Sequence, residues 1–389
     1  MSSPSSLLKR PRWASLLRQR DYLTLITEVL DRESSRYGNS ALFSAQEYPV
    51  LLRSCIHILA SSSPVVLAAI EGTLSRRLLT DPQLQEQYAV ISNQAHIQPS
   101  IYMHELVDDD GIAPTFAQFM RVRDAVMRYV DVENQGNGEF AWQVDNTTAP
   151  QVTRSASDTG YRKYLSSQRV FRSDTRVETL YKLCSGILWR CSIVATEQER
   201  STPLLFPPAE CGYSIDSHKR LAQHRLRRSS NYAMNLVEDI CSHLFATREF
   251  GQRFSMHGHI IYLIYREEQA AIAEILFSGL LDVWVDDGGG FNAYPAGRSV
   301  ASIKNVNRQK WMELERWVRE HSELVSNLNE LRERTEADVK RVRDEVGDAW
   351  IVALESSGDE GESGDREYVE DEGESGDTSV ESQLSLFHI

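Results

Sequence analysis

The residues whose types and spacing best fit a chemical task follow a glycine in the second half of the chain. Gly212 ends a short apolar run, and Asp216 lies four residues later, where its side chain can cap a helix. Arg220 and His224 come next and are four residues apart, so they share one face of that helix. A guanidinium and an imidazole on one face can hold a phosphate group through charge-assisted hydrogen bonds.

More basic residues continue this helix. A stripe of this kind is typical of a nucleic-acid footprint, and it is also typical of a solvated helix surface. We therefore predict DNA or RNA as a partner and keep a plain solvated face as the alternative. The candidate nucleic-acid-binding residues are Gly212, Lys219, Arg220, Arg225, Arg227 and Arg228.

A second candidate lies in the apolar segment 269–281. The neighbours of Glu274 at helical spacing are alanine, phenylalanine and serine residues, so no cation on its own helix can pair with it. A carboxylate in such surroundings needs a metal ion, a cation from elsewhere in the fold, or solvent. Glu274 is therefore a candidate metal ligand, with a solvent-exposed position as the alternative.

Together these residues resemble the GIY-YIG nuclease superfamily, over roughly residues 188–292. In that family a glycine ends the second strand, an Asn or Asp begins the next helix, and an arginine follows the glycine by eight residues, often with a histidine four further on. Gly212, Asp216, Arg220 and His224 stand at these offsets. The family continues with a third strand, a helix that carries a glutamate, and a closing aromatic-asparagine pair. The segment 259–266, Glu274 and Phe291-Asn292 correspond to these features.

The resemblance implies a small α/β domain that acts on phosphodiesters. It assigns catalytic positions to Arg220, His224 and Glu274. Arg220 would bind the scissile phosphate, and Glu274 would ligate a single Mg²⁺ or Mn²⁺ ion that stabilises the leaving oxygen. A tyrosine of the first two strands would help to activate water.

The sequence departs from the family at both tyrosine positions. Glu210 stands where the second strand would carry its tyrosine, and neither candidate for the first motif, 186–188 or 192–194, contains one. We therefore expect a protein that binds or acts on nucleic acid with impaired or lost nuclease activity. An active metal-dependent endonuclease and a helical protein-interaction adaptor are the two alternatives.

Apolar residues recur at steps of three and four positions over most of the chain, which predicts helices there. The predicted fold class is α+β, mainly helical. The α/β part is expected to contain strands at 190–196, 209–213 and 259–266, with helices at 216–228, 232–247 and 269–281. In the N-terminal region the spacing predicts helices at 13–32, 48–60, 65–79 and 115–130. We expect a disordered start (1–12), a helical region (13–131), a linker (132–172), the GIY-YIG-like domain (173–303), one long amphipathic or coiled-coil helix (304–352) and a disordered acidic tail (353–389).

Charge and cysteine usage narrow the class of protein further. The formal charge is −14, but twelve acidic residues against one arginine place −11 of it in residues 355–389. The remaining chain is nearly neutral, so local basic patches can dominate its field. Five scattered cysteines with no CxxC spacing indicate neither disulfides nor a zinc knuckle, and they fit a reducing compartment. We expect an intracellular protein of the nucleus or cytoplasm with no membrane-spanning segment. We also expect the 304–352 helix to bind a protein partner.

Overall fold

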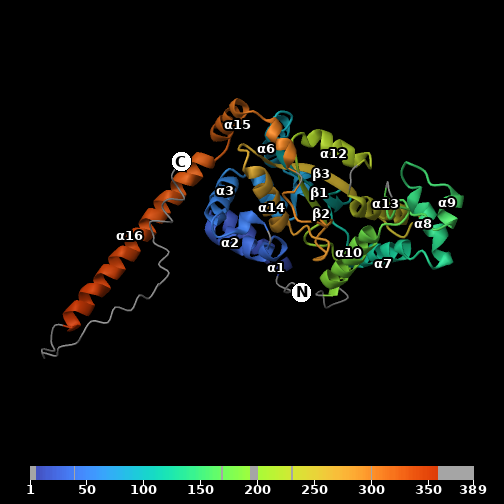
Figure 1. Ribbon diagram of the computed structural model, residues 1–389, viewed down its shortest axis with the longest axis horizontal. Helices are drawn as coiled ribbons and strands as arrows, with labels where there is room; N and C mark the ends of the chain where they lie inside the picture. The colour runs from blue at the N-terminus through green and yellow to red at the C-terminus, as the bar shows by residue number, and fades with distance from the viewer. Residues whose placement is uncertain are drawn as a thin grey trace. The chain divides into compact units, whose positions relative to one another are not determined.

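The protein is described here from a computed structural model, which defines residues 6–38, 40–167, 170–192, 200–228, 231–298 and 300–357. This part of the chain is mainly helical and has one small sheet, so the α+β class is confirmed (Figure 1). The chain forms two compact units, of which the first ends at Ser322 and the second begins at Glu323. The candidate site lies entirely in the first unit.

A three-stranded antiparallel sheet with strand order β2-β1-β3 forms the centre of the first unit. Its strands are β1 (Ser100–Val107), β2 (Ala209–Ser214) and β3 (Ser255–Leu263). The middle strand, β1, is buried along its whole length because a strand flanks each of its edges and helices pack on the sheet. The prediction of a strand at 209–213 is confirmed, whereas the predicted 259–266 strand is shifted and begins earlier.

The expectation that 13–131 is purely helical is wrong, because β1 lies within it. Its sequence, SIYMHELV, has neither the alternation of a half-exposed strand nor a continuous apolar run. The polar members are nevertheless buried, since each finds a partner elsewhere in the fold: Ser100 bonds to Ser217, and Glu105 accepts from the backbone N–H of Ser75. The helical region and the α/β domain predicted from the sequence therefore share one sheet within one compact unit.

Six helices precede β1 among the described residues; the predicted 48–60 helix is confirmed as α3, whereas the predicted 13–32 and 65–79 helices are each divided in two. Arg20 has a positive φ of 58°, which breaks the expected 13–32 helix in two, and Asp21 caps the second part. Gly72, with a φ of 69°, similarly divides the expected 65–79 helix. The first helix begins at Ser6, so most of the predicted disordered start is ordered, while residues 1–5 lie outside the described part. The helices are α1 (Ser6–Arg18), α2 (Tyr22–Glu33), α3 (Tyr48–Ala60), α4 (Pro64–Ile70), α5 (Leu74–Thr80) and α6 (Pro82–Gln94), with short 3-10 turns at Ser34–Arg36 and Ala41–Phe43.

A long helical segment separates β1 from β2. It contains α7 (Phe116–Val130), a 3-10 turn at Gln135–Asn137, α8 (Gly138–Asp145), α9 (Arg154–Asp158) and α10 (Asp174–Ser192). The prediction that 132–172 is a linker is wrong, because Phe140, Tyr164 and Leu165 are buried in the same core as α7 and α10. The segment looks polar because its contacts are largely hydrogen bonds rather than apolar packing. The strand expected at 190–196 is also wrong at its start, since Ser192 ends α10, and residues 193–196 lie outside the described part.

The helices after β2 position the candidate site. These are α12 (Ser217–Arg225), α13 (Tyr232–Ala246) and α14 (Gln269–Leu281), all close to the predicted bounds. In Figure 1 the blue helices α1–α3 lie on the same side of the sheet as α14, and the green helices α7–α10 lie toward the opposite end of the unit, beside α13.

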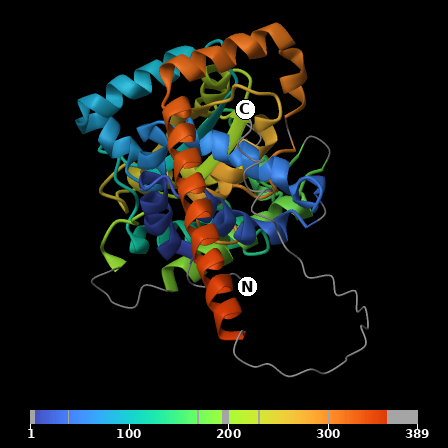
Figure 2. The ribbon, with the colours of Figure 1, turned by 90° about the vertical axis from the view of Figure 1, so that its left-hand side faces the viewer.

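The helix predicted for 304–352 is two helices. After a 3-10 turn at Ala301–Asn305, α15 covers Arg308–His321 in the first unit, and α16 covers Leu324–Ser357 in the second. Figure 2 shows α15 in orange beside the light-blue α6, where Gln94 and Trp317 line one shallow cavity. The acidic tail expected from 353 onward is helical as far as Ser357, and residues 358–389 lie outside the described part. Among the described residues no single helix is long and apolar enough to cross a membrane, although α3 and α4 reach that composition as a pair bent by 105°.

A buried carboxylate between α2 and α14 makes the stability of the first unit depend on pH. Glu33 is fully buried and accepts a hydrogen bond of 3.0 Å from Trp284 Nε1. Burial raises the pKa of Glu33 to about 7, against the opposing charges of Arg36 and Arg32. The folded protein therefore keeps a proton that the unfolded chain, with an ordinary glutamate pKa near 4.5, has lost, so this stabilisation is complete below about pH 4.5 and is lost as the pH rises to about 7. We expect the free energy of unfolding to fall by on the order of 2–3 kcal/mol between pH 5 and pH 8 from this group.

Urea unfolding of Glu33→Gln at several pH values tests this expectation. The amide keeps the acceptor for Trp284 and cannot ionise, so the variant should lose much of the wild type's pH dependence between pH 5 and pH 8. An unchanged slope in the variant would show that another group is responsible.

Candidate functional site

Strand register brings five residues together on one face of the sheet. Tyr102 of β1 lies opposite Gly212 of β2, and His104 lies opposite Glu210 on one side and Gly258 of β3 on the other. Directly paired residues in antiparallel strands share a face. These five residues therefore belong to one surface of the sheet, and it is the surface that α12 covers.

Two glycines make this arrangement sterically feasible. A Cβ atom on Gly212 would lie 2.6 Å from Tyr102 Oη, and one on Gly258 would lie 3.0 Å from the His104 ring. The rings of Tyr102 and His104 thus lie over glycines of the neighbouring strands. Gly212, which the sequence placed among nucleic-acid-binding residues, contacts the Tyr102 ring.

Helix α12 places Arg220 and His224 above these rings. Asp216 caps the helix by accepting from the backbone N–H of Lys219, and the Ser100 hydroxyl donates to Ser217 at 2.7 Å, which fixes the start of α12 on β1. Arg220 Nε then donates to Tyr102 Oη at 3.2 Å, and His224 Nε2 lies 3.5 Å from the same oxygen. The predicted pairing of Arg220 and His224 on one helix face is confirmed by these shared contacts.

Glu210 lies at the centre of the hydrogen-bonding network. Its Oε2 is 3.0 Å from His104 Nδ1 and 3.7 Å from His224 Nδ1, and its Oε1 accepts from Asn231 Nδ2 at 3.1 Å. Burial alone raises the pKa of Glu210, but the hydrogen bond from His104, the charge of the two imidazoles when protonated and the hydrogen bond from Asn231 lower it to about 2. Burial lowers the pKa of His224 to about 4. At neutral pH the cluster therefore holds an ionised carboxylate beside a neutral His224.

Tyr102 is buried, with 3% of its surface exposed. Burial and the nearby Glu210 carboxylate raise the pKa of its phenol, so it remains protonated near neutral pH. Its hydroxyl is held by the hydrogen bond from Arg220 and lies beside His224.

Glu274 lies apart from this cluster. Strand alternation directs Cys211 to the opposite face of the sheet, where α14 packs, and Glu274 is on that helix. Its Oε2 accepts from the backbone N–H of Gly297 at 2.8 Å. Burial raises the pKa of Glu274, against hydrogen bonds from the backbone N–H groups of Gly297 and Tyr213. Among the described residues no hydrogen bond or ion pair joins Glu274 to Arg220, and a metal ion on Glu274 stays a prediction.

The basic residues of α12 and of the turn that follows it divide into two groups. Lys219, Arg225 and Arg228 are exposed, and Arg220 is half-buried. Arg227 instead forms ion pairs with Glu238 at 2.5 Å and Asp239 at 3.4 Å, so its charge is neutralised within the fold.

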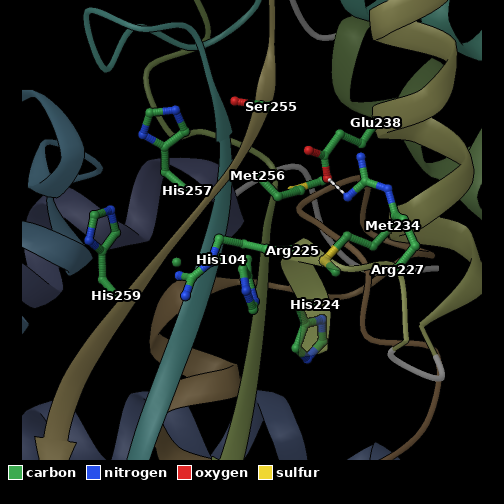
Figure 3. A pocket seen from close by; sticks show the side chains of 11 residues that line it. His104, His224, Arg225, Arg227, Met234, Glu238, Ser255, Met256, His257 and His259 are labelled. Carbon is green, nitrogen blue, oxygen red and sulfur yellow. Dashed lines mark hydrogen bonds and ion pairs between the residues drawn. The ribbon is translucent and has the colours of Figure 1, made fainter. Parts of the chain in front are cut away.

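A cavity of about 370 Å³ opens beside the cluster. Figure 3 shows His104 and His224 close together, with His257 and His259 farther away, and strand alternation directs these two side chains to the face of β3 opposite Gly258. Arg225 and Arg227 line the cavity as well. Of the four histidines that line the cavity, His104 and His224 are therefore the two on the sheet face that α12 covers.

Sequence reasoning missed Tyr102, His104 and Asn231. The first tyrosine motif was expected at 186–194, shortly before β2, whereas the strand that pairs with β2 lies about a hundred residues earlier. The available signal was the Ile101-Tyr102 pair, which sits in a stretch of high β-propensity.

Comparison with known proteins identifies no relative of this chain. No family model matches the chain, and no curated protein or solved structure matches it.

Proposed function

We propose that this protein binds nucleic acid through a degenerate GIY-YIG-like domain whose nuclease activity is impaired or lost. The observation that carries the proposal is the hydrogen bond of 3.2 Å from Arg220 Nε to Tyr102 Oη, opposite Gly212. It supplies the combination that the resemblance requires, namely a tyrosine on one strand, a glycine on its neighbour and an arginine on the next helix. Tyr102 also provides a tyrosine on the neighbouring strand, which the motif positions considered from the sequence did not contain.

The electrostatics support binding more than hydrolysis. Arg220, Lys219, Arg225 and Arg228 present cationic donors along α12, which suits phosphate oxygens. Glu210 stands where the family has its second tyrosine, and its ionised carboxylate repels a phosphate brought close to the cluster.

An active metal-dependent endonuclease is the second candidate, favoured by the presence of Tyr102. In this version Glu274, which lies on α14 at the opposite face of the sheet, would be the residue that holds Mg²⁺ or Mn²⁺. Incubation of supercoiled plasmid, branched DNA and RNA with either metal distinguishes the two candidates. Cleavage that Glu274→Gln and Arg220→Ala both abolish would replace the binding proposal with this one.

We expect Arg220→Ala to weaken binding to duplex or single-stranded nucleic acid on the order of tenfold at moderate salt. The reason is that a phosphate contact and its released counterion are lost, so the dependence of log affinity on log salt should also become shallower by about one unit. Fluorescence anisotropy with labelled DNA and RNA at several salt concentrations measures both quantities.

Arg76→Ala is the matched control. Arg76 is an exposed arginine on α5, so its removal changes the net charge equally without touching α12. Equal losses in both variants would indicate a general charge effect, and no measurable affinity of the wild type for DNA or RNA would contradict the proposal.

A further inference from the structure

We propose that His104, Glu210 and His224 bind one Zn²⁺ ion, at a site separate from the metal position expected at Glu274. The three residues come from β1, β2 and α12, and one ligand atom of each lies within 4.8 Å of the other two. This inference does not depend on nucleic-acid binding, because it concerns only the affinity of the protein for a metal ion.

The donor set matches the chemistry of zinc. Two imidazole nitrogens and one carboxylate oxygen form a set used in zinc enzymes, where a water or substrate completes a tetrahedron. Ligands about 2.0–2.1 Å from a tetrahedral ion lie about 3.3 Å from one another. Glu210 Oε2 is 3.0 Å from His104 Nδ1 and 3.7 Å from His224 Nδ1, so small side-chain movements bring both nitrogens to that separation.

A buried nitrogen of His224 supports a cation at this position. His224 directs Nε2 at Tyr102 Oη, and its Nδ1 is buried without a hydrogen-bond partner beside an ionised carboxylate. If Nε2 carries the proton, the Nδ1 lone pair faces the Glu210 carboxylate, which is unfavourable in a buried site. A divalent ion between the two acceptors converts this repulsion into coordination.

The surroundings of the three ligands resemble the outer shell of a metal site. Asn231 Nδ2 holds Glu210 Oε1 at 3.1 Å, which leaves Oε2 for the ion. The Tyr102 hydroxyl lies 3.5 Å from His224 Nε2 and can accept its N–H, an interaction that fixes the ring with Nδ1 toward the ion. All three ligands are at least nine-tenths buried, so their side chains are held in place before an ion arrives.

The cavity beside the cluster provides a route for the ion and space for a fourth ligand. His104 and His224 both line it, and Figure 3 shows their rings close together. The geometry leaves one coordination position for water.

The test is titration of chelator-treated, tag-free full-length protein with Zn²⁺ and with Co²⁺. We expect one equivalent to bind by isothermal titration calorimetry, the Co²⁺ form to show the visible absorption of tetrahedral cobalt, and Zn²⁺ to raise the melting temperature. His104→Gln, Glu210→Gln and His224→Gln should each weaken binding at least a hundredfold. Tyr102→Phe, which removes only the outer hydroxyl, should weaken it about tenfold.

His257→Gln is the control variant, because His257 lines the same cavity outside the ligand set. It should bind Zn²⁺ like the wild type. Absence of stoichiometric binding by folded wild-type protein would overturn the proposal. It would also be overturned if the three ligand variants, shown to be folded by circular dichroism, retained wild-type affinity or if only His257→Gln lost it.

Discussion

Replacing Arg10 by alanine is expected to lower the free energy of unfolding by about 3–5 kcal/mol. Arg10 is 3% exposed, and its guanidinium donates to the carbonyl oxygens of Ala69, Ile70 and Leu281 at 2.8–3.0 Å. It also lies 4.1 Å from the centre of the Phe206 ring. One side chain thus joins α1 to the ends of α4 and α14, and its loss leaves three carbonyl groups without these donors.

Arg12→Ala is the matched control, two residues further along the same helix. The Arg12 side chain is 60% exposed, and its ion pair is with Glu28 on the surface. A surface pair of this kind contributes little to stability because solvent screens it. Urea unfolding of both variants measures the difference, and similar small losses would mean that Arg10 does not join these helices.

Asp239→Ala is expected to release the segment between α8 and α10 from α13 and to cost about 3 kcal/mol. Asp239 is fully buried and accepts hydrogen bonds from the hydroxyls of Tyr164 and Thr148. It also pairs with Arg227 at 3.4 Å and with Lys163 at 3.8 Å. Without the carboxylate, two cations and two hydroxyls remain together in a poorly hydrated site, so the segment should detach more often.

Hydrogen exchange measured by mass spectrometry tests this result directly. Amides of residues 146–166 should exchange faster in Asp239→Ala, while those of β1 keep most of their protection. Asp158→Ala, which removes a carboxylate with 55% of its side chain exposed, should leave exchange unchanged. Unaltered exchange in Asp239→Ala would mean that other contacts hold the segment.

The helices that were predicted correctly are those whose sequence signals lie within a few residues of the helix itself. The bounds of α14 follow from a continuous apolar run, and α3 begins beside a proline that suits a first helical turn. Asp216 caps α12 through a residue three positions away, so the position of this helix was visible in the sequence. The shared face of Arg220 and His224 follows from the same helix geometry.

The errors come from residues whose partners lie far along the chain. Glu105 and His104 give β1 a polar appearance, and they are buried because Ser75 and Glu210 supply hydrogen bonds across the fold. Segment 132–172 resembles a linker for a related reason, since its order depends on Asp239 as well as on its few apolar residues. Composition measures apolar surface, and it does not measure hydrogen bonds that only the folded chain can form.

By itself the sequence determined the mainly helical α+β class, the acidic end and the helix that carries Arg220 and His224. Only the tertiary structure decided what that helix faces, because strand pairing brings Tyr102 and His104 against Glu210 and Gly212 from more than a hundred residues away. Helix periodicity can be recognised from residues that are close in the sequence, whereas strand register depends on which distant segments pair. For this reason the arginine and the histidine were found early, and the tyrosine and the His–Glu–His cluster appeared only in the fold.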